Sequence, residues 1–157
     1  HVHSLCQSSV MSEQERESFL SEFQSGRGTL VGFCVMGGIF SEGIDLLGDR
    51  LIGALIVGTG IPQVGTENEI LKAFYDERGE NGFDYAYRYP GMNKVLQAAG
   101  RVIRTQKDRG IILLLDERFC QRENLSLFPE EWSNYQVSKI TSVEKQLKKF
   151  WAGETSE

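Results

Sequence analysis

Three short apolar runs constrain the fold of this chain more than any other feature of its sequence. They span Leu30 to Met36, Leu51 to Val57 and Ile111 to Leu115. Near-continuous apolar runs of this length are typical of strands that are buried on both faces. Segments with helical periodicity lie between them, as at Glu69 to Tyr75 and Pro90 to Arg104. The sequence therefore predicts an α/β domain with a mainly parallel sheet and helices on both faces.

The two ends of the chain extend this alternating pattern. Val2 to Gln7 is predicted as a short strand, and Ser12 to Phe23 as a helix whose first residue forms a capping box with Glu15. Val143 to Trp151 is predicted as a final amphipathic helix. The charged, glycine-containing segment from Gly79 to Tyr85 is predicted as a loop.

The composition bounds the class of protein. A chain of 157 residues with 40% hydrophobic content is large enough for one domain with a real core, so residues 1–157 are predicted to form a single domain. Its 17 Lys and Arg against 22 Asp and Glu give a net charge of −5, which is no general signal for nucleic acid or a membrane surface. Any nucleic-acid contact must therefore come from a local patch.

Three cysteines, Cys6, Cys34 and Cys120, lie far apart and form no CxxC pair. Their spacing argues against a disulfide framework, a zinc site or an iron–sulfur cluster within the chain, and no metal site is expected. Cys34 lies in an apolar run and is predicted to be a small buried hydrophobic residue. With no signal peptide and no apolar segment of roughly 18 residues, a cytoplasmic protein without a membrane partner is expected.

A cationic stripe is predicted on the helix from Pro90 to Arg104. At about 100° per residue, Gln97, Arg101 and Arg104 project within about 60° of one another. Apolar residues fill the opposite side: Met92, Val95, Leu96, Ala99, Val102 and Ile103. Asp108 and Gly110 mark the predicted exit from the helix. A cationic stripe that contains a glycine suits a polyphosphate that approaches closely.

A glycine-containing turn follows the first apolar run, from Gly37 to Asp45. In parallel α/β sheets, ligands bind beyond the carboxyl ends of the strands, where glycines let the backbone approach a phosphate or a sugar. Ser41, Glu42 and Asp45 bring side-chain acceptors to that edge. Taken alone, the stretch is more typical of an ordinary turn, and it is not a P-loop because the chain contains neither GxxxxGKS nor GxxxxGKT.

Together, the two stretches resemble motifs V and VI of superfamily 2 helicases, and most closely those of the DinG and XPD-type DNA helicases. The similarity extends from about Met11 to Phe119, with Gly38 to Asp45 in the place of motif V and Gln97 to Arg104 in the place of motif VI. A short closing segment is also similar: Phe128, Pro129 and Trp132. The chain departs from the pattern at Gly58 to Pro62, where many relatives are rich in proline and aromatic residues.

The resemblance implies a second RecA-like motor domain, a three-layer α/β/α fold of the P-loop NTPase type that lacks the P-loop. In that family ATP binds with Mg²⁺ between two motor domains, and the first supplies the phosphate-binding loop and the Mg²⁺ ligands. This chain is therefore expected to be a C-terminal piece of a larger ATP-dependent DNA helicase and to be inactive alone. Its expected partners are single-stranded DNA and the N-terminal motor domain of the same polypeptide.

The resemblance also implies roles for individual residues. Arg101 and Arg104 match the arginine fingers that act on the γ-phosphate, and Gln97 is the third residue expected to take part in catalysis. The residues expected at the nucleotide are Asp45, Glu42, Gly43 and Gly100. The residues expected at the DNA backbone are Gly38 and Ser41.

Simpler alternatives exist at several of these positions. Each arginine could form a surface ion pair, Gln97 could brace motif V, and Gly100 could serve close helix packing. Asp45 could be a carboxylate at a helix start, and Glu42 a solvated charge. The competing class of protein is a noncatalytic α/β module that binds nucleic acid or a protein, in which the arginines contact DNA phosphates.

Two further pairs of residues are expected to be structural. Tyr87 and Tyr89 are expected to pack rather than to stack on a base. Asp116 and Arg118 are expected to form a turn with a local ion pair rather than a DNA contact.

Overall fold

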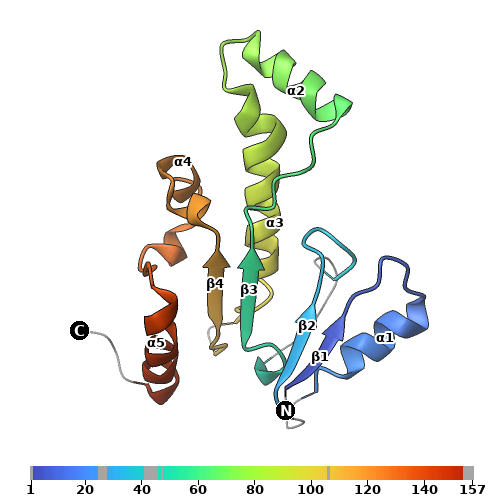
Figure 1. The fold of residues 1–157 in the computed structure, drawn as a ribbon, viewed down its shortest axis with the longest axis vertical. Coiled ribbons are helices and arrows are strands. Elements are labelled where there is room, and N and C mark those ends of the chain that lie inside the picture. The colour runs from blue at the N-terminus through green and yellow to red at the C-terminus, as the bar shows by residue number, and fades with distance from the viewer. Residues whose placement is uncertain (1, 25–27, 41–45, 47, 106, 154–157) are drawn as a thin grey trace. The chain divides into compact units, whose positions relative to one another are not determined.

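The chain forms two compact units, residues 1–126 and residues 127–157. A computed structural model describes residues 2–24, 28–40, 46, 48–105 and 107–153. Figure 1 labels the helices and strands of both units along the chain. The first unit holds the four described strands, and the second holds a short helical turn and one long helix.

The first pair of parallel strands lies near the N-terminus. β1 (His3–Cys6) pairs with β2 (Leu30–Phe33), and α1 (Glu13–Ser21) connects them (Figure 1). Ser12 and Glu15 form the predicted capping box, because the Glu15 carboxylate accepts the Ser12 N–H at 2.7 Å and the Ser12 hydroxyl accepts the Glu15 N–H at 3.3 Å. The Ser12 N–H and the Ser12 hydroxyl, which donates to the same carboxylate at 2.8 Å, hold the pKa of Glu15 below its usual value.

An aromatic cluster joins α1 to the first strand pair. Phe19 is buried, and its ring stacks on Phe40 with 4.4 Å between centroids and contacts Phe23 at 5.6 Å. Gly32 of β2 leaves room for this cluster, since a Cβ there would lie 2.6 Å from the tip of Phe23. The helical spacing of these phenylalanines therefore produces the packing of α1.

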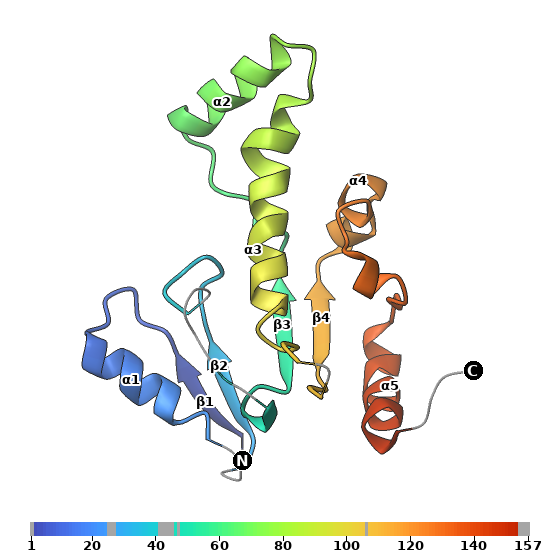
Figure 2. The same ribbon diagram turned by 180° about the vertical axis from the view of Figure 1, so that it is seen from behind.

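The second pair of parallel strands is covered by a helix on one face. β3 (Gly53–Val57) pairs with β4 (Ile111–Leu115), and α3 (Tyr89–Ala99) packs against β3 (Figure 2). The buried side chains of this layer are Ile56, Met92, Val95, Ala99 and Val102. Ile103 is 48% exposed, so its predicted place on the apolar side of the helix is wrong. The mixed α/β architecture with parallel strands confirms the predicted fold class.

Two glycines allow α3 to start against the end of β3. A Cβ on Gly60, whose φ is +68°, would lie 2.6 Å from the Gly91 carbonyl oxygen. A Cβ on Gly91 would lie 2.6 Å from the Thr59 carbonyl oxygen. Both distances are shorter than any ordinary carbon–oxygen contact, so only glycine permits this approach.

Pro90 lies in the first turn of α3, as predicted, but helical backbone already begins before this helix. α2 (Thr66–Asp76) is followed by η2 (Asp84–Arg88), a π-helical segment that continues into α3. Pro90 has no N–H to donate, and a π-helical turn before it accommodates the missing hydrogen bond without ending the helix. The predicted loop up to Tyr85 is correspondingly shorter, since Asp84 and Tyr85 are helical.

The remaining elements are short, apart from the last helix. In the first unit these are η1 (Gly48–Arg50), η3 (Glu117–Cys120) and α4 (Arg122–Leu125). The second unit contains η4 (Glu130–Trp132) and α5 (Ile140–Ala152), which ends at Gly153 with φ +79°. Within the part of the chain that the structure describes, no helix is both long and apolar enough to cross a bilayer.

Cys34 is exposed, and the prediction that it is buried is wrong. β2 ends at Phe33, one residue earlier, so Cys34 follows the strand instead of lying within it. Cys6 and Cys120 are also exposed free thiols.

Candidate nucleotide and nucleic-acid site

The two arginines of the predicted stripe lie after α3 and not on it. We name residues 100–105 and 107–108 the arginine loop. Gly100 donates its N–H to the Leu96 carbonyl at 2.8 Å and caps α3, after which Arg101 donates to Ala98 at 3.3 Å in a tighter turn. The prediction of one helix to Arg104 is therefore wrong in its last turn. Gln97 is exposed on α3, and both arginines are half-buried in the arginine loop.

Asp108 explains why the helix ends early. Its Oδ2 accepts the Arg104 N–H at 2.9 Å and the Thr105 N–H at 2.8 Å. In a continuous helix the Arg104 N–H would donate to the carbonyl of Gly100, so the carboxylate replaces the helical acceptor. The two backbone hydrogen bonds hold the pKa of Asp108 below its ordinary value. Gly100 also has a low helix propensity, which favours termination at this point.

A buried valine anchors the arginine loop between its two arginines. Val102 is 4% exposed and lies against Gly110, where any Cβ would collide with it. Next to it, Ile111 donates its N–H to the Ile52 carbonyl at 3.1 Å. The arginine loop is therefore fixed near the amino ends of β3 and β4, with Arg101 and Arg104 on either side of the anchor.

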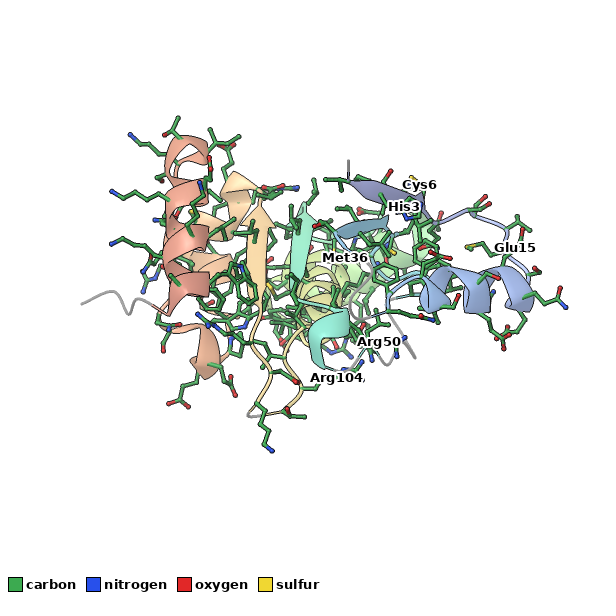
Figure 3. The ribbon with its side chains drawn as sticks, turned by 90° about the horizontal axis from the view of Figure 1, so that it is seen from below. His3, Cys6, Glu15, Met36, Arg50 and Arg104 are labelled. Atoms are coloured by element: carbon green, nitrogen blue, oxygen red, sulfur yellow. The ribbon has the colours of Figure 1, made fainter. Side chains whose placement is uncertain are left out.

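A second structure, at the carboxyl end of β2, begins the motif V stretch. We name Val35 to Gly38 the glycine turn. Gly38 donates its N–H to the Val35 carbonyl at 2.9 Å, and Gly37 has φ +77°. A turn with a positive φ at its third residue strongly favours glycine there. Figure 3 labels Met36 of this turn and Arg104 of the arginine loop.

A glutamine that sequence reasoning missed holds the glycine turn. Gln7 follows β1 and extends the ladder by donating its N–H to the Phe33 carbonyl at 2.8 Å. Its side-chain Oε1 accepts the Val35 N–H at 2.9 Å. Its Nε2 lies 3.1 Å from the position that a Cβ on Gly38 would occupy. No local sequence signal identifies this role, because the two partners are 28 residues apart.

Most of the predicted motif V residues lie outside the part of the chain that the structure describes. These are Ser41, Glu42, Gly43 and Asp45. The residues on either side are both buried, Phe40 at 5% and Leu46 at 6% exposure. Of the residues predicted to contact DNA, Gly38 is described, in the glycine turn.

The pair that follows β4 is a local ion pair, as predicted. Arg118 donates from Nε and Nη2 to the two carboxylate oxygens of Asp116, at 2.9 and 2.7 Å. This bidentate contact lowers the pKa of Asp116 and raises that of Arg118. The buried Asn124 side chain donates to the Arg118 carbonyl at 2.8 Å and ties the turn to α4.

The tyrosines near Pro90 pack against protein groups, as predicted. Tyr87 is 3% exposed, and its hydroxyl donates to Glu69 at 2.5 Å. Tyr89 contacts Tyr85 edge to face at 5.2 Å, and Tyr85 stacks on Tyr75 at 3.8 Å. A hydrogen bond to Glu80 is the main cause that raises the pKa of Tyr85 to about 12.

Residues 1–135 match the family described as the Helicase C-terminal domain, so the chain belongs to that family. A helicase subunit XPD of general transcription and DNA repair factor IIH from Dictyostelium discoideum is 30% identical over 73% of this chain and 15% of that protein. The ATP-dependent DNA helicase YoaA of Escherichia coli is 28% identical over 72% of this chain and 18% of that protein. The ATP-dependent DNA helicase DinG of Photobacterium profundum is 36% identical over 54% of this chain and 12% of that protein.

The fold is likewise that of a solved helicase. An XPD helicase structure matches with a TM-score of 0.60 and 23% identity, over 78% of this chain and 23% of that chain. The predicted resemblance to a C-terminal helicase domain of the DinG and XPD type is therefore confirmed. The chain spans less than a fifth of the length of these three curated relatives.

Proposed function

We propose that this chain is the second motor domain of an ATP-dependent DNA helicase and completes an ATP site shared with a first motor domain. One observation carries the proposal: Arg101 and Arg104 flank the buried Val102, and Asp108 holds the backbone of Arg104. Guanidinium groups that are held before the reaction stabilise charge on a transferring phosphoryl group without a cost of reorganisation. The names of the relatives DinG and YoaA, both ATP-dependent DNA helicases, support this assignment.

In this proposal the arginine loop faces the triphosphate. Arg101 and Arg104 contact the γ-phosphate, and Gln97 and Gly100 lie at the adjoining end of α3. The motif V residues Asp45, Glu42 and Gly43 complete the nucleotide side. Mg²⁺ is assigned to the first motor domain, which is expected to supply its ligands.

The opposite end of motif V is assigned to single-stranded DNA. Gly38 lies in the glycine turn, at the carboxyl end of a parallel strand, where a backbone without a side chain admits a phosphate. Ser41 adds a hydroxyl further along the same stretch. Motif V would therefore connect the DNA strand to the nucleotide within one segment.

The test uses the full-length protein that contains this chain. Arg104→Ala is expected to lower kcat for DNA-stimulated ATP hydrolysis by about a thousandfold, while the Kd for single-stranded DNA changes less than about twofold. Arg104→Lys should remain strongly impaired, because lysine lacks the planar fork of arginine. Arg122→Ala, which removes an exposed arginine of α4, is the matched control and should leave both values unchanged.

Two results would contradict the proposal. A large loss of DNA affinity with an intact kcat in Arg104→Ala would assign the arginines to DNA phosphates, as in a noncatalytic binding module. Robust DNA-stimulated ATP hydrolysis by the 157-residue chain alone would contradict a shared ATP site.

A further inference from the structure

The side chain of Lys94 covers the glycine turn. A Cβ on Gly37 would lie 3.1 Å from Lys94 Cδ, 3.2 Å from Cε and 3.6 Å from Cγ. The aliphatic stem therefore takes the space that a side chain at position 37 would need. Because Gly37 has φ +77°, this backbone also disfavours any residue with a Cβ. Lys94 and Gly37 thus form one contact between α3 and the start of motif V.

The stem delivers an ammonium group to the glycine turn. Nζ is one carbon–nitrogen bond, about 1.5 Å, beyond the Cε atom that contacts Gly37. Lys94 is half-buried and takes part in none of the ion pairs found among the described residues. A lysine packed in this way keeps its charge at the end of an apolar stem that is already fixed.

Position along α3 separates Lys94 from the arginine loop. Gly100 lies six positions after Lys94, which corresponds to about 9 Å along the helix axis at about 1.5 Å per residue. The arginine loop starts at Gly100, whereas Lys94 contacts Gly37 at the other structure of the site. The Lys94 ammonium therefore lies near the glycine turn and not near the arginine loop.

We propose that Lys94 is a phosphate-binding residue for single-stranded DNA at the glycine turn. The inference rests on the proposed helicase function, which places the DNA backbone at Gly38. Gly37 is exposed and presents backbone without a side chain of its own, and the Lys94 ammonium supplies positive charge beside that backbone. Residues at the DNA backbone thus come from α3 as well as from motif V.

Salt dependence distinguishes this role from packing alone. Each lysine contact to a phosphate of single-stranded DNA contributes about 0.7 to the slope of log K against log salt concentration. Lys94→Met keeps an unbranched apolar stem over Gly37 and removes the charge. In the full-length protein without nucleotide, Lys94→Met should reduce the magnitude of this negative slope for a fluorescent dT20 by about 0.7. It should also weaken binding about fivefold at 0.1 M NaCl.

Three comparisons complete the experiment. Lys94→Arg should restore most of the affinity and the slope, because it restores the charge. Lys72→Met removes one positive charge from α2, where Lys72 pairs with Asp76 at 2.7 Å, and should leave the slope unchanged. The KM for ATP should be unchanged in Lys94→Met, whereas the DNA concentration that half-stimulates ATP hydrolysis should rise.

The results separate this inference from the proposed function. If Lys94→Met keeps the wild-type slope, or raises the KM for ATP instead, Lys94 does not bind the DNA backbone and the inference is wrong. If the full-length protein binds dT20 but does not hydrolyse ATP, the proposed function fails, while the salt slope still decides the role of Lys94. A full-length protein that does not bind dT20 contradicts both the proposed function and the inference about Lys94.

Discussion

The arginine loop and the glycine turn both present backbone at the end of a regular element, but they are held in opposite ways. The arginine loop is held locally, because Asp108 accepts N–H groups from residues three and four positions earlier. The glycine turn is held from a distance, by Gln7 of the β1 end and by Lys94 of α3. A local brace can be changed without moving the strands, whereas a distant brace couples the turn to two other elements.

Loss of the local brace should give the largest effect. Asp108→Ala removes the acceptor for the Arg104 and Thr105 N–H groups, so the backbone that carries the Arg104 side chain is no longer held. In the full-length protein we expect kcat for ATP hydrolysis to fall roughly ten- to hundredfold with little change in DNA affinity. Asp108→Asn retains an oxygen acceptor and should lose much less. Equal kcat values in Asp108→Ala and wild type would show that the brace is not needed for catalysis.

Two glycines with the same φ test the distant brace. Gly37 and Gly79 both have φ +77°, but a Cβ on Gly79 meets nothing within 4 Å. Gly79→Ala should cost about 1–2 kcal/mol of unfolding free energy for the backbone alone, and Gly37→Ala should cost more because its Cβ presses on Lys94. Urea unfolding of both variants measures the difference. The double variant Gly37→Ala with Lys94→Ala should remove the excess, and an excess that persists would place its cause elsewhere.

The hydrogen bond of Gln7 should contribute less. Gln7→Ala leaves the Val35 N–H without its side-chain acceptor, which should lower the unfolding free energy by about 0.5–1.5 kcal/mol. Gln7→Glu keeps an oxygen in the same place and serves as the control. Thermal unfolding of the two variants provides the measurement, and equal losses would indicate that the acceptor at Val35 is not the stabilising element.

Acid should loosen the arginine loop and not the glycine turn. The pKa of Asp108 is lowered from 3.8 in the folded chain, so its stabilising contribution is present above 3.8 and is lost as the pH falls through the lower folded value. Gln7 does not titrate in this range. Hydrogen exchange should therefore show the Arg104 and Thr105 amides losing protection, as the pH falls below 3.8, before the Val35 amide does, after correction for intrinsic rates. Simultaneous loss at all three amides would indicate global unfolding instead.

Elements with a local signal could be predicted from the sequence. The run Ile111 to Leu115 has the observed bounds of β4, and the capping box of Ser12 and Glu15 is present. The helix that starts near Pro90 was predicted, but its C-terminal end was misplaced. Pro90 lies in the first turn of α3 as predicted, but the pattern did not indicate the π-helical turn before it. The pattern also continued the helix past Gly100, although Asp108 accepts the Arg104 and Thr105 N–H groups.

In the candidate site, too, the sequence indicated only those residues that have a local signal. Arg101 and Arg104 were selected because their spacing within a helical pattern is a local signal, and their role at a nucleotide stays a prediction. The contact of Asp108 has a local signal too, a carboxylate four residues after Arg104. Gln7 and Lys94 could not be found, since each acts on a residue far away in the sequence. Only the pairing of β1 with β2 and the packing of α3 bring them to the glycine turn.

The π-helical turn before Pro90 also affects how this chain should be aligned with relatives. It adds one residue to the helical repeat, so the faces before and after it are out of phase by about 100°. Removing one residue from η2 while replacing Pro90 by alanine would rotate Tyr87 away from Glu69 and leave the core face of α3 in place. Relatives without a proline here are therefore expected to be one residue shorter, and an alignment without a gap at this point would pair the wrong tyrosines.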